Sequence, residues 1–527
     1  MIYHCEDHTC NYWDEGEKLP ERCPQCGRKL LRANEADMTG DDWTALGNTL
    51  WDAEASDKKR MVDCFRKAAY LGSAWGVCNL GICMEQGNGV EADPVQAFWL
   101  YQQAVEMGSL NAVCCLGVCY QYGIGTAPDA KQAAELYCKA AEYGSPRGQM
   151  LLAHAFHDGI GVEADAAEAV YWVRAAAYQR YGEGMYRLGV CYEYGDGVEQ
   201  NWERAVHWFR EAAESGVSAA MADLGYCYEK GCGVEQSWEQ AFSWYRRGAE
   251  CGNPVSMSNL GLCYKRGYGV EQNWQEAVKW YEQGAQCGHL QSMNNLACCY
   301  EDGEGVEQNM TEAIRWYTAA AEGGNADAMH DLGWLYDHGE GVEQDMKKAI
   351  CWYERAAEQN HPAAMNSLGE CYAMGRGVPR DLETAMEWYR RAAELGEAMA
   401  DYNMGWHLEQ AGKLSEAYAH YRKAADGNDD SAWWALGRFY ENGVVVAQDG
   451  KEARRCYETG EKLGSVKCKM RLARCKLLGI GGRRAKKAGL DLCRQALELA
   501  KESSEKEDYG YEAEMNLLRR TIAENES

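Results

Sequence analysis

The sequence predicts an all-α solenoid built from about twelve helix-turn-helix units of 36 residues. The first observation is a Leu-Gly pair, or a close variant, that returns every 36 residues between Leu80 and Met404. A fixed period in this range is typical of stacked repeats, in which each unit contacts only its neighbours. The second observation is a helical spacing of apolar residues within each unit, and the third is the presence of only 8 Pro in 527 residues. We therefore expect function on an extended surface and not in one compact core.

Composition and charge narrow the classes of partner. Hydrophobic residues make up 46% of the chain, which is enough to bury a continuous core. The formal net charge of −27 disfavours nucleic acid, whose binding depends on Lys and Arg that neutralise phosphates, and it disfavours an anionic membrane surface. An acidic surface either keeps a long chain soluble or favours a basic protein partner.

The expected location is the cytoplasm. The N-terminus, MIYHCEDHTC, has no basic stretch followed by an apolar segment, and nowhere do 18 apolar residues run together. Several of the 25 Cys lie three residues after the repeat leucine, and equivalent residues of adjacent units should be roughly 10 Å apart, too far for a disulfide. We interpret them as small buried thiols in a reducing compartment.

Residues 1–36 precede the repeats and predict a zinc-ribbon-like module. The metal ligands are Cys5 and Cys10, followed after twelve residues by Cys23 and Cys26. Two cysteine pairs on short turns can form a tetrahedral thiolate set, which holds one structural Zn²⁺ and leaves no open position for catalysis. His8 could replace Cys10, because Cys5-x2-His8 also has ligand spacing.

The segment CPQCG at 23–27 resembles a rubredoxin-like knuckle. That family usually has two residues between its first pair of cysteines, whereas four separate Cys5 from Cys10. The longer gap favours zinc over redox iron, although iron stays an alternative.

Residues 37–482 contain the repeats, and the unit from 217 to 252 shows their logic. Apolar residues recur at helical spacing around Leu224 and again around Trp244, which predicts two amphipathic helices, here called A and B. Between them GCGV at 231–234 ends helix A, because glycine tolerates positive φ. Helix B then begins at a capping residue such as Ser237. The GxG segments follow helices, so we do not interpret them as phosphate-binding loops.

Helix B has a repeated sequence pattern, of which AVHWFREAAESG at 205–216 and AMEWYRRAAELG at 385–396 are two examples. With the Leu-Gly of helix A and the GxGV turn, it resembles the Sel-one-like repeat, a cousin of the tetratricopeptide repeat. The resemblance covers residues 38–482. It implies a right-handed α-solenoid that binds proteins. Residues 483–527 contain two further helical stretches, which we interpret as a C-terminal helical cap for the last unit.

No catalytic constellation is found in the repeats. The 11 His are scattered and never form H-E-x-x-H. The tryptophan stripe that keeps the phase of helix B is expected to pack between the two helices; it comprises Trp172, Trp208, Trp244, Trp280, Trp316, Trp352 and Trp388. We therefore predict that the protein is not an enzyme.

The resemblance also indicates where a partner would bind. In tetratricopeptide-like repeats helix A lines the concave face, and the residue before the repeat leucine points into the groove. These positions are Asn79, Asp223, Asn259, Asn295, Asp331 and Asn403. A row of amides can bind the backbone of an extended segment, although the same side chains could instead bond within the array. Two residues after the leucine come Tyr226, Trp334 and Trp406, and five after it come acidic residues that would favour Lys or Arg in a partner.

The predicted function is a non-enzymatic scaffold or adaptor that binds an extended or basic protein segment along the concave face. Two alternatives stay open. One is a redox or metal-dependent protein that uses the N-terminal cysteines. The other is an extracellular cysteine-rich repeat protein, in which paired cysteines flank each Leu-Gly, whereas here one Cys follows it.

Overall fold

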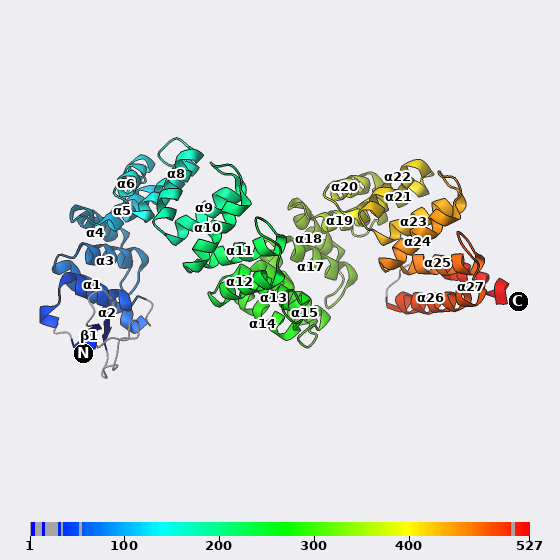
Figure 1. The fold of residues 1–527 in the computed structure, drawn as a ribbon, viewed down its shortest axis with the longest axis horizontal. Helices are drawn as coiled ribbons and strands as arrows, with labels where there is room; N and C mark the ends of the chain where they lie inside the picture. The colour runs from blue at the N-terminus through cyan, green and yellow to red at the C-terminus, as the bar shows by residue number, and fades with distance from the viewer. Residues whose placement is uncertain are drawn as a thin grey trace. The chain divides into compact units, whose positions relative to one another are not determined.

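The computed structural model describes residues 2–5, 13–15, 30–32, 35–51, 55–506 and 512–526. Within these residues the chain forms consecutive helix pairs after a small sheet (Figure 1). The chain divides into two compact units, residues 1–273 and residues 274–527. The expected solenoid of repeated helix pairs is confirmed.

The first unit begins with three short strands, β1 (Ile2–Cys5), β2 (Trp13–Glu15) and β3 (Leu30–Arg32), followed by the 3-10 helix η1 (Glu35–Asp37). The strands form an antiparallel sheet in the order β2-β1-β3. The helices of this unit are α1 (Gly40–Thr49), α2 (Ala55–Tyr70), α3 (Ala74–Gln86), α4 (Pro94–Glu106), α5 (Leu110–Tyr122), α6 (Ala130–Glu142), α7 (Pro146–Asp158), α8 (Ala166–Tyr178), α9 (Gly182–Tyr194), α10 (Trp202–Glu214), α11 (Ser218–Lys230), α12 (Trp238–Glu250) and α13 (Pro254–Arg266).

The second unit continues the same alternation of A and B helices. Its helices are α14 (Trp274–Gln286), α15 (Leu290–Asp302), α16 (Met310–Gly323), α17 (Ala326–His338), α18 (Met346–Glu358), α19 (Pro362–Met374), α20 (Leu382–Glu394), α21 (Ala398–Gln410), α22 (Leu414–Asp426), α23 (Asp430–Asn442), α24 (Gly450–Lys462), α25 (Val466–Leu478), α26 (Lys486–Lys506) and α27 (Glu512–Glu526). Among the described residues, no helix combines the length and the apolar character that crossing a membrane requires.

Local chemistry sets the helix ends where the sequence predicts them. Gly231 ends α11 in the left-handed conformation, with φ of 74°, and its N–H donates to the carbonyl of Cys227. Ser237 begins α12, and its hydroxyl accepts a hydrogen bond from the N–H of Gln240 at 3.3 Å. The cap satisfies a backbone donor that the first helical turn leaves without a partner.

The core repeats with the period. The repeat leucine, most alanines of helix B and the tyrosine that follows the tryptophan in most units are buried; Tyr245, for example, is 0% exposed. The cysteines three residues after the leucine are buried as well, except Cys191, which is half-buried, and burial raises the pKa of the Cys263 thiol to about 12. The tryptophan stripe is mostly half-buried, so tyrosine is the larger contributor to the fully buried core.

Helix α27 lies against α25 at the end of the second unit. Arg471 pairs with Glu514 at 2.6 Å, and Met515 and Leu518 pack with Met470 and Leu477. The module boundaries 1–36, 37–482 and 483–527 stay predictions.

Candidate partner-binding site

The predicted binding positions lie on successive A helices. The residues before the repeat leucine, two after it and five after it are spaced three apart, so they share one side of each helix. We call this surface the A-helix face. All six predicted Asn and Asp residues on it are half-buried: Asn79 (α3), Asp223 (α11), Asn259 (α13), Asn295 (α15), Asp331 (α17) and Asn403 (α21).

Two of these amides bond to the neighbouring A helix. Asn79 Nδ2 donates to Asn48 Oδ1 at 2.8 Å. Asn403 Nδ2 donates to Asn366 Oδ1 at 3.0 Å and lies 3.2 Å from a carboxylate oxygen of Glu370. These contacts match the alternative that the sequence left open, in which the amides bond within the array. At these two positions the amide therefore holds adjacent units together, whatever else it binds.

Three further members of the row, Asn295, Asp331 and Asp223, also contact nearby side chains. Gln291 Nε2 donates to Asn295 Oδ1 at 3.4 Å, and His330 Nδ1 lies 3.2 Å from a carboxylate oxygen of Asp331. Burial raises the pKa of Asp223, and a hydrogen bond from Tyr186 opposes that shift. The row is a half-buried polar seam with side chains from two or more helices.

The predicted aromatic positions are more open. Tyr226 is 43% exposed and Trp406 is 38% exposed. Trp334 is half-buried and stacks on His338 with ring centroids 4.2 Å apart. Tyr226 and Trp406 thus present apolar surface that a partner could bury.

The acidic positions have a contact that the sequence did not reveal. In several units the buried tyrosine of helix B donates its hydroxyl to the carboxylate five residues after the repeat leucine. The pairs are Tyr101 with Glu85 at 2.6 Å, Tyr245 with Glu229 at 2.8 Å, Tyr317 with Glu301 at 2.5 Å and Tyr457 with Glu441 at 2.7 Å. The constant spacing of 16 residues is visible in the sequence, but the sequence indicated only acidic residues that would favour Lys or Arg in a partner. These carboxylates belong partly to the core.

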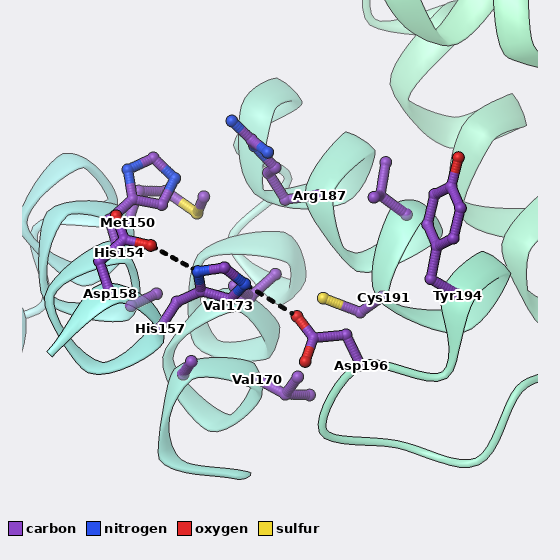
Figure 2. A pocket seen from close by; sticks show the side chains of 13 residues that line it. Met150, His154, His157, Asp158, Val170, Val173, Arg187, Cys191, Tyr194 and Asp196 are labelled. Carbon is purple, nitrogen blue, oxygen red and sulfur yellow. Dashed lines mark hydrogen bonds and ion pairs between the residues drawn. The ribbon is translucent and has the colours of Figure 1, made fainter. Parts of the chain in front are cut away.

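A cavity of about 450 Å³ opens among α7, α8 and α9 in the first unit. Its wall includes residues at the three offsets of the A-helix face: His154 and His157 from α7 and Arg187 from α9 (Figure 2). Apolar side chains, including Met150, Val170 and Val173, form the rest of the wall.

Charged groups surround the mouth of this cavity. His157 Nδ1 lies 2.6 Å from Asp158, and its Nε2 lies 3.3 Å from Asp196, as the dashed lines in Figure 2 show. The hydrogen bond with Asp158 and the charge of Asp196 raise the pKa of His157 above its usual value, although desolvation opposes them. Burial, and then the charge of Arg187, lower the pKa of His154.

The predicted zinc ligands fall almost entirely outside the described residues. Cys5 is the last residue of β1 and pairs with Leu30 of β3, while Cys10, Cys23, Cys26 and the alternative ligand His8 are outside the described residues. In the part of the chain that the structure describes, no three His, Cys, Asp or Glu side chains gather as metal ligands would.

Comparison with known proteins agrees with the repeat geometry. The Sel1 repeat matches eleven segments, at residues 76–109, 112–145, 146–181, 182–217, 218–253, 254–289, 290–325, 326–361, 362–397, 398–429 and 432–465. The chain is 30% identical to c5321, a protective antigen of uropathogenic Escherichia coli strains that displays an SLR fold, with a TM-score of 0.57 over 81% of this chain and 94% of that one.

A Sel1 repeat protein from Oxalobacter formigenes is 32% identical over 46% of this chain and 96% of its own, with a TM-score of 0.43. Among curated proteins no match was found. Eleven matched repeats, together with helix pairs that follow the same period, show that the chain belongs to the Sel1 repeat family.

Proposed function

We propose that this protein is a non-catalytic scaffold that binds an extended protein segment along the A-helix face. The resemblance to tetratricopeptide repeats implies that this face is the concave one. Sel1 repeat proteins typically mediate protein-protein interaction, and their solenoid is typically a scaffold without catalysis. The observation that supports a site on this face is the exposure of Tyr226 and Trp406 beside half-buried polar side chains. An apolar anchor with polar neighbours is the usual composition of a binding hot spot.

The partner segment is expected to be basic. The chain carries a formal net charge of −27, and such a field attracts Lys and Arg and repels acidic segments. Because the tyrosine hydroxyls already bond to Glu229 and Glu301, the attraction is expected to come from the whole surface more than from single ion pairs. Binding should therefore weaken as salt is raised from about 50 to 500 mM.

A displayed library of linear peptides, selected on the full chain, tests the proposal. Tyr226→Ala and Trp406→Ala should each weaken binding of the peptides that contact that position by about tenfold or more, because hot-spot aromatics contribute 2 kcal/mol or more. Tyr143→Ala is the matched control, because Tyr143 is 69% exposed at the end of the B helix α6. If neither A-helix variant weakens any selected peptide more than the control does, binding on this face is wrong.

Asn403→Ala tests partner binding less directly than Tyr226→Ala and Trp406→Ala do. Asn403 bonds to Asn366 and lies near Glu370, so its loss changes the packing of adjacent helices as well as the surface. Asn259→Ala and Asn295→Ala are better probes of the polar seam when each is paired with a measurement of helix stability.

We also propose a structural Zn²⁺ bound by Cys5, Cys10, Cys23 and Cys26, and only the cysteine spacing supports it. Metal analysis of the purified full chain should give one zinc per chain, and zinc should be lost in Cys23→Ser. Iron with a reversible colour change would instead favour the redox alternative. The cytoplasmic location likewise stays a prediction from sequence.

A further inference from the structure

The cavity among α7, α8 and α9 lies where this unit departs from the others. Val173 stands 21 residues after its repeat leucine, at the position that is tyrosine in eight other units. Those tyrosines are at most 1% exposed: Tyr101, Tyr137, Tyr245, Tyr281, Tyr317, Tyr353, Tyr389 and Tyr457. A valine has no ring and no hydroxyl, so the helix pair is left with space that a tyrosine side chain fills elsewhere.

The residues that surround the tyrosine in another unit occupy the same repeat positions as residues that line the cavity. The Tyr317 hydroxyl lies 3.2 Å from Cys298 Sγ, two residues after the repeat leucine, and donates to Glu301, five after it. In the helix pair α7–α8, which contains Val173 and is called the open unit below, the corresponding residues are His154 and His157, and both line the cavity. His154 Nε2 is buried without a hydrogen-bond partner among the described residues. The residue at the offset where Cys298 contacts a tyrosine hydroxyl therefore carries a buried polar atom that has no partner among the described residues.

The space is left by Val173 and not by Ala153, the alanine on the facing helix α7. In most units a glycine follows the repeat leucine and packs on the tyrosine ring; a Cβ on Gly225 would lie 2.5 Å from Tyr245 Cε1. The open unit has Ala153 at this position, but Ala297 occupies it in another unit beside a fully packed Tyr317. Alanine is thus compatible with the ring, and the space is accounted for by Val173 in place of tyrosine.

The lining suits a side chain that is apolar with one polar end. Met150, Val170 and Val173 provide apolar contacts, while His154 and the ion-paired His157 provide polar atoms. The volume of about 450 Å³ lies within the range of about 300–1,000 Å³ that is usual for ligand pockets. Because residues at the three offsets of the A-helix face line the cavity, a segment bound on that face would lie next to it.

We propose that this cavity is an anchor pocket for a tyrosine side chain of the bound protein segment, which takes the place of the tyrosine that the unit lacks. The inference rests on the proposed function, because it names the residue by which the partner is held. The ring would pack on Val170 and Val173, and the hydroxyl would bond to His154 Nε2. The repeat's own use of tyrosine at this position is the argument for tyrosine over an aliphatic side chain.

The first experiment needs no partner. p-Cresol and toluene, the side-chain analogues of Tyr and Phe, are titrated into the full chain while the methyl NMR signals of Met150, Val170 and Val173 are followed. p-Cresol should shift these signals and bind more tightly than toluene. His154→Leu should remove the preference for p-cresol. Absence of any shift in the wild-type chain overturns the pocket.

The second experiment fills the pocket from within. Val173→Tyr restores the residue of the other units and should abolish p-cresol binding and raise the melting temperature. Val95→Tyr, at an exposed position of α4, is the control that adds a tyrosine elsewhere. If Val173→Tyr fails to fold, Ala153→Gly combined with Val173→Tyr restores the whole Gly–Tyr pair. Unchanged p-cresol binding in a folded filled variant contradicts the assignment.

The third experiment identifies the source of the ring. Among displayed peptides selected on the wild-type chain, those lost in the folded filled variant should contain tyrosine, and replacing it with alanine should weaken binding at least tenfold. The two changes together should cost no more than either alone, because they remove the same contact. Peptides that lose affinity in Tyr226→Ala but bind the filled variant unchanged would leave the proposed function intact and overturn the anchor pocket. If no peptide is selected while p-cresol still binds, the partner tyrosine is wrong and the pocket takes a free phenol.

Discussion

At the scale of single residues, the carboxylate of helix A provides the hydrogen-bond partner that the buried tyrosine hydroxyl of helix B needs. A fully buried tyrosine hydroxyl needs a hydrogen-bond partner, because an unpaired buried group costs about 1–3 kcal/mol. Glu229 provides that partner for Tyr245 at 2.8 Å. In the unit with Glu193 the tyrosine is replaced by Phe209, which is 0% exposed and has no hydroxyl. Burial, and then the charge of Asp223, raise the pKa of Glu193.

Phe209→Tyr should therefore increase the stability of the helix pair α9–α10. The new hydroxyl would lie 16 residues from Glu193, the spacing of the observed pairs, and one net hydrogen bond contributes about 0.5–1.5 kcal/mol. Amide exchange in α9 and α10, measured by mass spectrometry, should slow by roughly 2- to 10-fold. The gain should disappear when Glu193→Leu is added. Faster exchange in Phe209→Tyr would mean that the hydroxyl is buried without a partner.

Asp429 gives a prediction that depends on pH. It caps α23 by accepting from the N–H of Ala432 at 2.6 Å, and burial raises its pKa from 3.8 to about 6. Below about pH 3 the carboxyl is mostly protonated in both folded and unfolded chains. Between pH 4 and 6 the unfolded chain ionises first, so stability falls as pH rises, and the loss is complete above pH 6.

Asp429→Asn should remove this loss, because Asn caps a helix as well as Asp and does not titrate. The variant should be more stable than wild type by about 1–2 kcal/mol at pH 7.5, a value reduced because the group is partly exposed, and by only about 0.3 kcal/mol at pH 4, where the unfolded carboxyl is about half ionised. Thermal melts of both chains at the two pH values measure the difference. Asp449→Asn, at the exposed cap of α24, controls for the change of cap residue. Equal effects at both pH values would contradict the role of burial.

At the scale of elements, the GxGV turn has two glycines with different roles. Gly231 ends α11 at φ of 74°, and a Cβ there would meet nothing closer than 3.4 Å. Gly233 also has a positive φ, 69°, but its Cβ would lie 2.4 Å from the backbone carbonyl of Trp202, in the preceding B helix. The first glycine shapes the turn, and the second also lets one unit approach the next.

Gly233→Ala should therefore destabilise the chain more than Gly231→Ala does. The left-handed conformation alone costs about 1–2 kcal/mol for alanine, which is the whole effect expected for Gly231→Ala. The clash with Trp202 adds about 1–3 kcal/mol at Gly233. Exchange of α10, α11 and α12 amides in the two variants measures both costs. Equal costs would show that the units can separate slightly without penalty.

At the scale of the whole molecule, each described pair is stabilised mainly by its neighbours in sequence. α27 is the last such neighbour, and it covers α25 through the Arg471–Glu514 pair and the packing of Met515 on the last core. In a solenoid, removing a terminal element should destabilise the adjacent units first and distant units little.

Removal of residues 511–527 tests this. Amide exchange should become faster in α25, less so in α23, and should not change in α3 to α6. The physical reason is that Met470 and Leu477 lose their cover and Arg471 loses its partner, while the far units keep every contact. A uniform increase along the chain would mean that the whole molecule unfolds as one unit.

The sequence alone determined the repeated helix pairs, the turns and the caps. These depend on residues within about 20 positions of each other, such as Ser237 at the start of α12, and they return with every period. The buried leucines and cysteines could be predicted for the same reason, because the period fixes which side of its helix each residue occupies. Three offsets of the A-helix face were likewise predicted, although binding there is still to be tested.

Only the tertiary structure decided which side chains meet. The period gives the phase of a residue on its own helix but not its distance from a residue on another helix. The sequence therefore predicted only that the acidic residues five after the leucine would attract a basic partner, whereas the structure pairs one of them, Glu229, with buried Tyr245. Nor could the sequence assign Asn79 to Asn48 of the adjacent A helix. Val173 stood in the sequence as a break in the tyrosine pattern, but only the packing of α7, α8 and α9 shows that nothing else fills its place, because the helix spacing is set by the other units.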